Sequence, residues 1–165
     1  MRFSTLIATL LIAQAGMAAA QPQATFQTKS LTPETALVAA KAALEACRKQ
    51  GYQVGVAVVD RAGITQVFLR DRFAGPHTLE VATNKAWTAN TIRSSTLAFA
   101  SETQAGKSMS GIRSASRLLA VGGGLVIEGG GSSLGAIGVS GAPGGEADDV
   151  CAQAGIKAIA DAIEF

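Results

Sequence analysis

The residues best suited to chemistry in this 165-residue chain lie between positions 75 and 89. If this segment is helical, residues separated by four, four and three positions share one stripe, which holds His77, Val81, Lys85 and Thr88. Trp87, the only tryptophan, lies on an adjacent flank and could form a wall for a flat apolar ligand. A metal-ligating nitrogen, an ammonium for a carboxylate and an aromatic wall would together suit haem. The spacing alone favours an ordinary alternative, namely a surface histidine at a helix start, a solvated lysine and a core tryptophan.

Other catalytic arrangements find little support in the residue types. His77 is the only histidine, and no Gly-x-Ser-x-Gly nucleophile elbow is present. The segment Gly138–Gly141 resembles such an elbow only superficially, because its spacing and the following Pro143 do not suit a strand-to-helix turn. With a single histidine a zinc site is not expected either, although His77 remains a candidate iron ligand. We assign no catalytic residue, and the sequence favours a binding protein over an enzyme.

Three glycine clusters lie in the second half of the chain, at 122–124, 129–131 and 141–145. A phosphate-binding P-loop is excluded because no lysine occurs between positions 121 and 145. A dinucleotide fingerprint is not matched, since the first cluster leads into a predicted strand rather than a helix. We interpret the glycines as serving tight turns and close strand approach. The alternative is that residues 141–145 present backbone N–H groups to a ligand at a helix start.

The elements that must position these residues alternate in a recognisable order. A helix capped by Thr32 is expected to run to Gly51, because apolar residues recur at helical spacing and Pro33 suits a first turn. The remaining predictions are a hairpin at 54–69, helices at 77–93 and 94–101, strands at 117–121, 125–127 and 134–140, and a closing helix at 146–163. The order α-β-β-α-α-β-β-β-α predicts an α/β (α+β) domain with helices packed on a mostly antiparallel sheet.

The first 20 residues have the features of a cleavable signal peptide. Arg2 precedes an apolar segment at 3–15, and Ala18–Ala20 matches a small-residue cleavage site. A membrane anchor is the alternative, but the apolar segment is shorter than the ~20 residues that a span needs. We therefore expect a periplasmic or secreted protein with cleavage after Ala20, a flexible lead-in at 21–30 and one domain at 31–165.

The number of cysteines and the net charge further restrict the class of protein. An exported protein with two cysteines is expected to form a disulfide, here Cys47–Cys151, although two buried thiols are the alternative. The bridge would close a loop of about 105 residues and stabilise the fold by ~4–5 kcal/mol on the chain-entropy argument. The formal net charge is only +2, which offers no basic face for nucleic acid. No segment after the predicted signal is long and apolar enough to span a membrane.

An ordered set of motifs resembles a known family. The set comprises Leu31-Thr32 before an alanine-rich helix, Val56–Gly63, Lys85–Ala89, Gly122–Gly124 and Gly135–Pro143. In this order the motifs resemble the GlcG/HbpS-like proteins, also called the haem-degrading or haem-binding domain family. The resemblance covers residues 31–163, nearly all of the chain after the predicted signal.

The resemblance implies a profilin-like domain with a five-stranded antiparallel sheet, and a homo-oligomer. Some members bind haem or release its iron, and the region matching Lys85–Ala89 is implicated, which makes Thr88 a candidate contact. Our main hypothesis is an exported protein that binds haem or a related tetrapyrrole, with Lys85 pairing a propionate and Thr88 or His77 near the iron. The alternatives are an oligomeric accessory protein of an exported redox enzyme and an enzyme that degrades haem.

Overall fold

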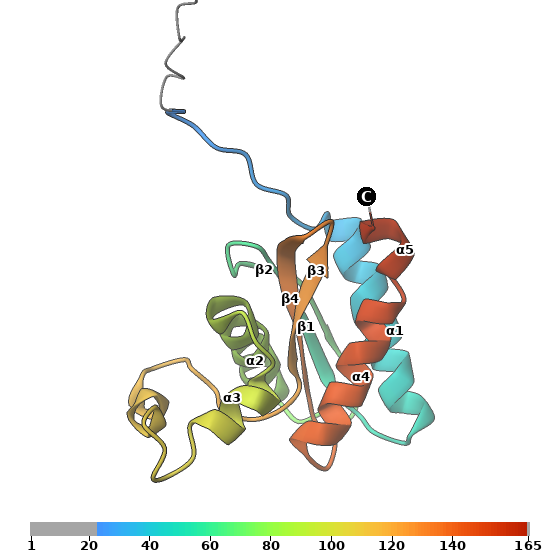
Figure 1. Ribbon diagram of the computed structural model, residues 1–165. Helices are drawn as coiled ribbons and strands as arrows, with labels where there is room; N and C mark the ends of the chain where they lie inside the picture. The colour runs from blue at the N-terminus through green and yellow to red at the C-terminus, as the bar shows by residue number, and fades with distance from the viewer. Residues whose placement is uncertain (1–22, 165) are drawn as a thin grey trace, which may run out of the picture.

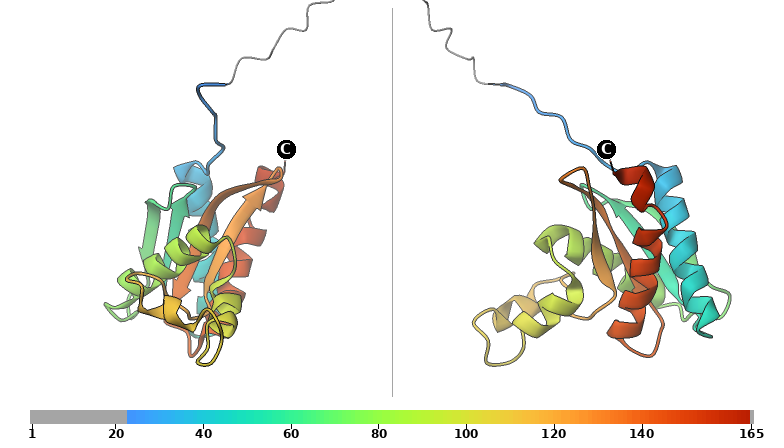
Figure 2. Two further views of the ribbon diagram at one scale, coloured as in Figure 1. Left: turned by 60° about the vertical axis from the view of Figure 1, so that its left-hand side comes forward. Right: turned by 45° about the vertical axis from the view of Figure 1, so that its right-hand side comes forward.

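The computed structural model describes residues 23–164, which form three layers around a four-stranded antiparallel sheet (Figure 1). The strand order is β2-β1-β4-β3, and the bounds are β1 Gly55–Asp60, β2 Thr65–Arg70, β3 Gly124–Gly129 and β4 Ser132–Ser140. One face carries α1 (Pro33–Lys49), α4 (Gly145–Lys157) and the short α5 (Ala160–Ile163), and the other carries α2 (Thr78–Ile92) (Figure 2). Beyond α2 lie α3 (Thr96–Glu102) and a 3₁₀ helix at Ser110–Ser114. Within residues 23–164 no helix combines the length and apolar character needed to span a membrane.

The first helix and the first hairpin form as their local residues predict. Thr32 caps α1 by accepting a hydrogen bond from the Thr35 N–H at 3.3 Å, and Pro33 occupies the first turn. In the turn between β1 and β2, the Asp60 carboxylate accepts from the N–H groups of Ala62 and Ile64 at 2.8 and 2.9 Å. These contacts confirm the predicted helix and hairpin.

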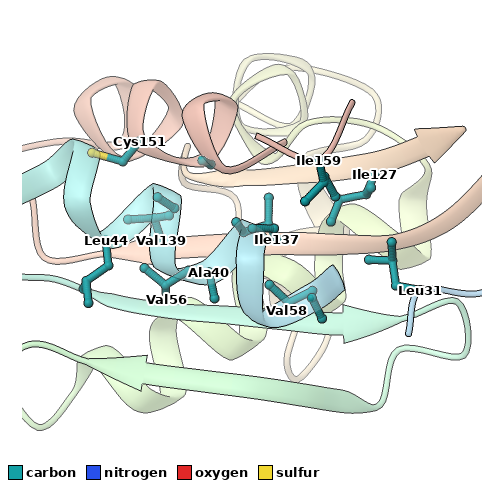
Figure 3. Packing of buried hydrophobic residues seen from close by; sticks show 14 of the residues in the cluster. Leu31, Ala40, Leu44, Val56, Val58, Ile127, Ile137, Val139, Cys151 and Ile159 are labelled. Atoms are coloured by element: carbon teal, nitrogen blue, oxygen red, sulfur yellow. The ribbon is translucent and has the colours of Figure 1, made fainter. Parts of the chain in front are cut away.

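The larger core lies between the sheet and the layer formed by α1 and α4. Val56 and Val58 of β1 and Ile137 and Val139 of β4 pack there against alanine-rich helix faces (Figure 3). The predicted Cys47–Cys151 disulfide is present at an S–S distance of 2.07 Å and joins α1 to α4, with both residues fully buried. The disulfide therefore connects two helices that already share one core.

On the opposite face α2 lies directly against the backbone of the sheet. Its buried residues are mostly small, and they include Ala82, Ala86 and Ala89. A Cβ atom added at Gly138 would overlap the carbonyl oxygen of Ala82, and one at Gly124 would overlap that of Lys85. These glycines therefore permit close approach of a helix to the sheet, whereas the sequence predicted close approach between strands.

The fifth strand and the element order were predicted wrongly. The segment 117–121 is irregular, because the Arg117 carbonyl and the Leu119 N–H bond to the Thr88 hydroxyl of α2 instead of pairing with a strand. Arg117 also has φ 75°, which interrupts an extended conformation. The described order is thus α-β-β-α-α-β-β-α-α.

The closing helix was predicted as one element at 146–163 but is broken in two. After α4 the Ile159 N–H bonds to the Ile156 carbonyl, three residues back, and Ile159 leaves the helical conformation with ψ 2°. The break allows both Ile159 and Ile163 to be buried in the larger core. Burial of two isoleucines therefore accompanies the interruption of the helix.

The contact between α2 and β4 gives a first prediction. In Gly138→Ala the new methyl group has no space, so we expect the free energy of unfolding to fall by about 1–3 kcal/mol or more. Gly111→Ala is the matched control, because a Cβ at Gly111 meets nothing within 4 Å. Urea unfolding of both variants measures the difference, and equal stability of the two would show that the contact is not tight.

Candidate functional site

A cleft of about 760 Å³ opens where β4 ends and where α2 and α4 begin. Its walls come from segments far apart in the chain, namely 51–53, 73–77, 119–121 and 140–145, together with side chains of α2 and α4. His77, at the N-cap of α2, and Val81 and Lys85 of that helix line the cleft, whereas Thr88, the fourth residue of the predicted stripe, does not. The volume is in the range typical of small-molecule and cofactor sites.

A buried ion pair forms the floor of the cleft. The Lys85 Nζ lies 2.7 Å from Asp148 Oδ2 and donates a second hydrogen bond to the Val139 carbonyl at 3.0 Å. The two side chains are 2% and 4% exposed. Burial raises the pKa of the Asp148 carboxyl, while the nearby ammonium acts in the opposite direction. Lys85 was expected to pair a propionate, whereas in the structure its ammonium is paired with Asp148, which argues against that role.

Asp148 and Asp149, consecutive residues in the first turns of α4, hold the backbone on two sides of the cleft. Asp148 Oδ1 accepts a hydrogen bond from the Ala142 N–H at 3.1 Å, and Asp149 Oδ1 accepts one from the Gly123 N–H. Burial also raises the pKa of the Asp149 carboxyl. The sequence analysis did not identify these contacts, because their partners lie 6 and 26 residues away in the chain.

His77 lies at the mouth of the cleft, at the N-cap position of α2, and is exposed to solvent. Its ring packs against Gly75, where a Cβ atom would lie 2.6 Å from a ring carbon. Among the described residues its ring nitrogens have no hydrogen-bond partner. The same lining includes the apolar side chains of Phe73, which is 80% exposed, Leu119 and Val121. This mouth therefore combines a free imidazole with exposed apolar surface.

Thr88 and Trp87 do not line the cleft. Thr88 is fully buried beneath the segment 117–119, where its hydroxyl donates to the Arg117 carbonyl at 3.3 Å and accepts from the Leu119 N–H at 3.0 Å. The Arg117 guanidinium lies 4.6 Å from the centroid of the Trp87 ring, a cation–π contact. The structure thus brings His77 and Lys85 to one cleft and covers Thr88 and Trp87 with another segment.

No cluster of three or more histidine, cysteine, aspartate or glutamate side chains that could hold a metal ion occurs in the described part of the chain. His77 would therefore act as a single protein ligand. One imidazole can suffice for haem iron, because the porphyrin itself supplies four nitrogen ligands. A bare metal ion usually needs three or four protein ligands.

Comparison with known proteins gives a consistent result. The family described as haem degrading protein HbpS-like matches residues 31–157. Protein ORFY of Klebsiella pneumoniae is 29% identical, with a TM-score of 0.79 over 82% of this chain and 94% of that chain. A double mutant of Streptomyces reticuli HbpS is 37% identical, with a TM-score of 0.77 over 87% and 96%. A PduOC–haem complex is 30% identical, with a TM-score of 0.75 over 79% and 95%. No curated protein gives a significant match.

The hydroxyl of Thr88 provides a prediction about the segment that covers it. Thr88→Val removes both hydrogen bonds to residues 117 and 119, so we expect trypsin to cleave after Arg113 and Arg117 about fivefold faster or more. Thr91→Val is the control, because the Thr91 hydroxyl bonds only within α2, to the Trp87 carbonyl. Limited proteolysis followed by mass spectrometry measures both rates. Equal cleavage of the two variants would contradict the proposed role of Thr88 in holding this segment.

Proposed function

We propose that this chain, which belongs to the HbpS-like family of haem degrading proteins, binds haem at the mouth of the cleft beside α2. The observation that carries the proposal is the exposed imidazole of His77 among apolar side chains. Support comes from the PduOC–haem complex, which shares 30% of its residues with this chain and has a similar fold.

The residues at the mouth suit the chemistry of haem. The His77 imidazole would ligate the iron, and Phe73, Leu119 and Val121 would contact the apolar macrocycle. Lys85 is the only cation among the described residues that line the cleft, and Asp148 neutralises it. The propionates would therefore remain toward solvent. When bound, haem supplies a redox-active iron, and the chain supplies the ligand and the apolar surface around it.

Haem degradation is a second candidate function, favoured by the description of the matching family. Lys85 and Asp148 at the floor of the cleft are buried and bonded to each other, so neither side chain is free to transfer a proton to a ligand. Degradation would therefore depend mainly on iron chemistry with dioxygen as the oxidant and an external reductant as the electron source. The homo-oligomeric state implied by the resemblance stays a prediction.

A haem titration tests the binding proposal. Wild-type protein should give a saturable shift of the Soret band, and His77→Ala should weaken binding by about tenfold or more, a loss of about 1.4 kcal/mol. Glu80→Ala is a suitable control, since Glu80 is an exposed residue of α2 outside the cleft lining. Unsaturable binding by the wild type would overturn the proposal, and unchanged affinity of His77→Ala would overturn the assignment of the iron ligand.

The same complex distinguishes binding from degradation. After addition of a reductant in air, loss of the Soret band together with release of chelatable iron supports degradation. A stable spectrum without iron release supports binding alone.

We further propose that the chain is exported and that its signal peptide is cleaved after Ala20. The predicted signal lies outside the described residues, so support comes from its sequence and from the Cys47–Cys151 disulfide, which is typical of oxidising compartments. In a Gram-negative host expressing the full chain, the periplasmic protein should have a mass that corresponds to a first residue of Gln21. A protein that retains Met1 and remains in the cytoplasm would refute export.

A further inference from the structure

We infer that Asp148 is a positioning residue for the haem-binding cleft: held by Lys85, it fixes the loop 141–145 that forms one wall. The link to haem rests on the proposed function, whereas the anchoring of the loop by Asp148 concerns the protein without a ligand. Asp148 uses one carboxylate oxygen for Lys85 and the other for the Ala142 N–H. A single side chain thus connects α2, α4 and the loop.

Among the described residues, only Asp148 makes a side-chain hydrogen bond to this loop, and its own N–H donates to the Gly144 carbonyl at 3.1 Å. Three of its five residues are glycines, and Gly141 has φ 127°, a conformation that other residues rarely adopt. The loop passes between Gln53 and Gly122, since a Cβ at Gly141 would lie 2.6 Å from the Gln53 carbonyl oxygen and one at Gly122 would lie 2.9 Å from the Gly145 carbonyl carbon. Without an anchor, a glycine-rich loop of this kind has many accessible conformations. The hydrogen bond from the Ala142 N–H supplies that anchor.

Stability alone does not account for a charged pair at this place. Removing two charges from water is costly, and apolar residues of similar volume often replace a buried ion pair without loss of stability. The Lys85 ammonium has a specific partner in the Val139 carbonyl at the end of β4, which fixes where the pair lies. Lys85 therefore fixes Asp148 relative to the end of β4, and Asp148 in turn fixes the loop that follows this strand.

Asp149 makes a parallel contact on the other side. Its carboxylate accepts from the Gly123 N–H, two residues after Val121 of the cleft lining. Adjacent residues of α4 thus hold both chain segments that flank the floor. This arrangement explains why two consecutive acids of the helix are buried when each alone would already complement the helix dipole.

A matched pair of double variants isolates the anchoring contact. K85M/D148N and K85M/D148L both remove the two buried charges, but only the asparagine keeps an oxygen that can accept from the Ala142 N–H. If the inference is correct, both variants unfold at similar urea concentrations, while Ala142 exchanges its amide hydrogen about fivefold faster or more in K85M/D148L. The haem affinity of K85M/D148L should fall about fivefold relative to K85M/D148N.

The readouts separate failure of the inference from failure of the proposed function. Equal amide exchange at Ala142 in the two variants would overturn the inference whether or not haem binds. Faster exchange with equal haem affinity would overturn the link between the loop and the haem-binding cleft. If wild-type protein binds no haem saturably, the proposed function fails and amide exchange still decides the anchoring role. Should K85M/D148L not fold, K85M/D148A replaces it in the same comparison.

Discussion

The direct contact of α2 with the backbone of the sheet is the constraint on which the rest of this structure depends. Gly138 and Gly124 present no side chains toward the helix, so α2 approaches until its own backbone lies against them. No water layer separates the two surfaces, and any polar group that α2 carries on this face must find its partners within the protein. The buried polar residues of α2 each bond within the protein, namely Thr78, Lys85, Thr88 and Asn90. Lys85 and Thr88 are the two of these that bond to α4 and to the segment 117–119, respectively.

Lys85 is directed toward the end of β4 and the start of α4, where Val139 and Asp148 satisfy its ammonium. Thr88 is one turn further along and is satisfied by the backbone of residues 117 and 119. Each contact draws a separate chain segment onto α2, and these segments form the cleft wall and the covering segment, respectively. His77 precedes the first turn of α2 and is therefore not buried by the contact between this helix and the sheet. It stays exposed at the mouth of the cleft.

Local signals explain which parts of the fold were predictable from sequence. Caps, turns and apolar periodicity depend on neighbouring residues, and they located α1, the first hairpin and the start of α2 correctly. The segment 117–121 was predicted as a strand because its apolar residues suit one, yet its backbone partner is a threonine 29 residues earlier. Similarly, nothing local distinguishes a lysine that meets Asp148, 63 residues later, from one that meets solvent. The sequence therefore predicted the residues that α2 contributes to the site, but it did not predict the ion pair at the floor of the cleft or the loops that form its walls.

The neutralised floor limits how the cleft can recognise a ligand. An unpaired Lys85 in a site of low dielectric constant would attract any carboxylate strongly, and binding would then depend mainly on charge. Pairing with Asp148 removes that attraction, so selectivity passes to the groups at the mouth, the imidazole of His77 and the apolar side chains around it. A small organic acid would find no unpaired lysine or arginine in the described lining. A large, flat, apolar ligand with its own metal could use both the imidazole of His77 and the apolar side chains around it. The buried pair that argues against propionate binding at Lys85 therefore also supports haem over a small acid as the ligand.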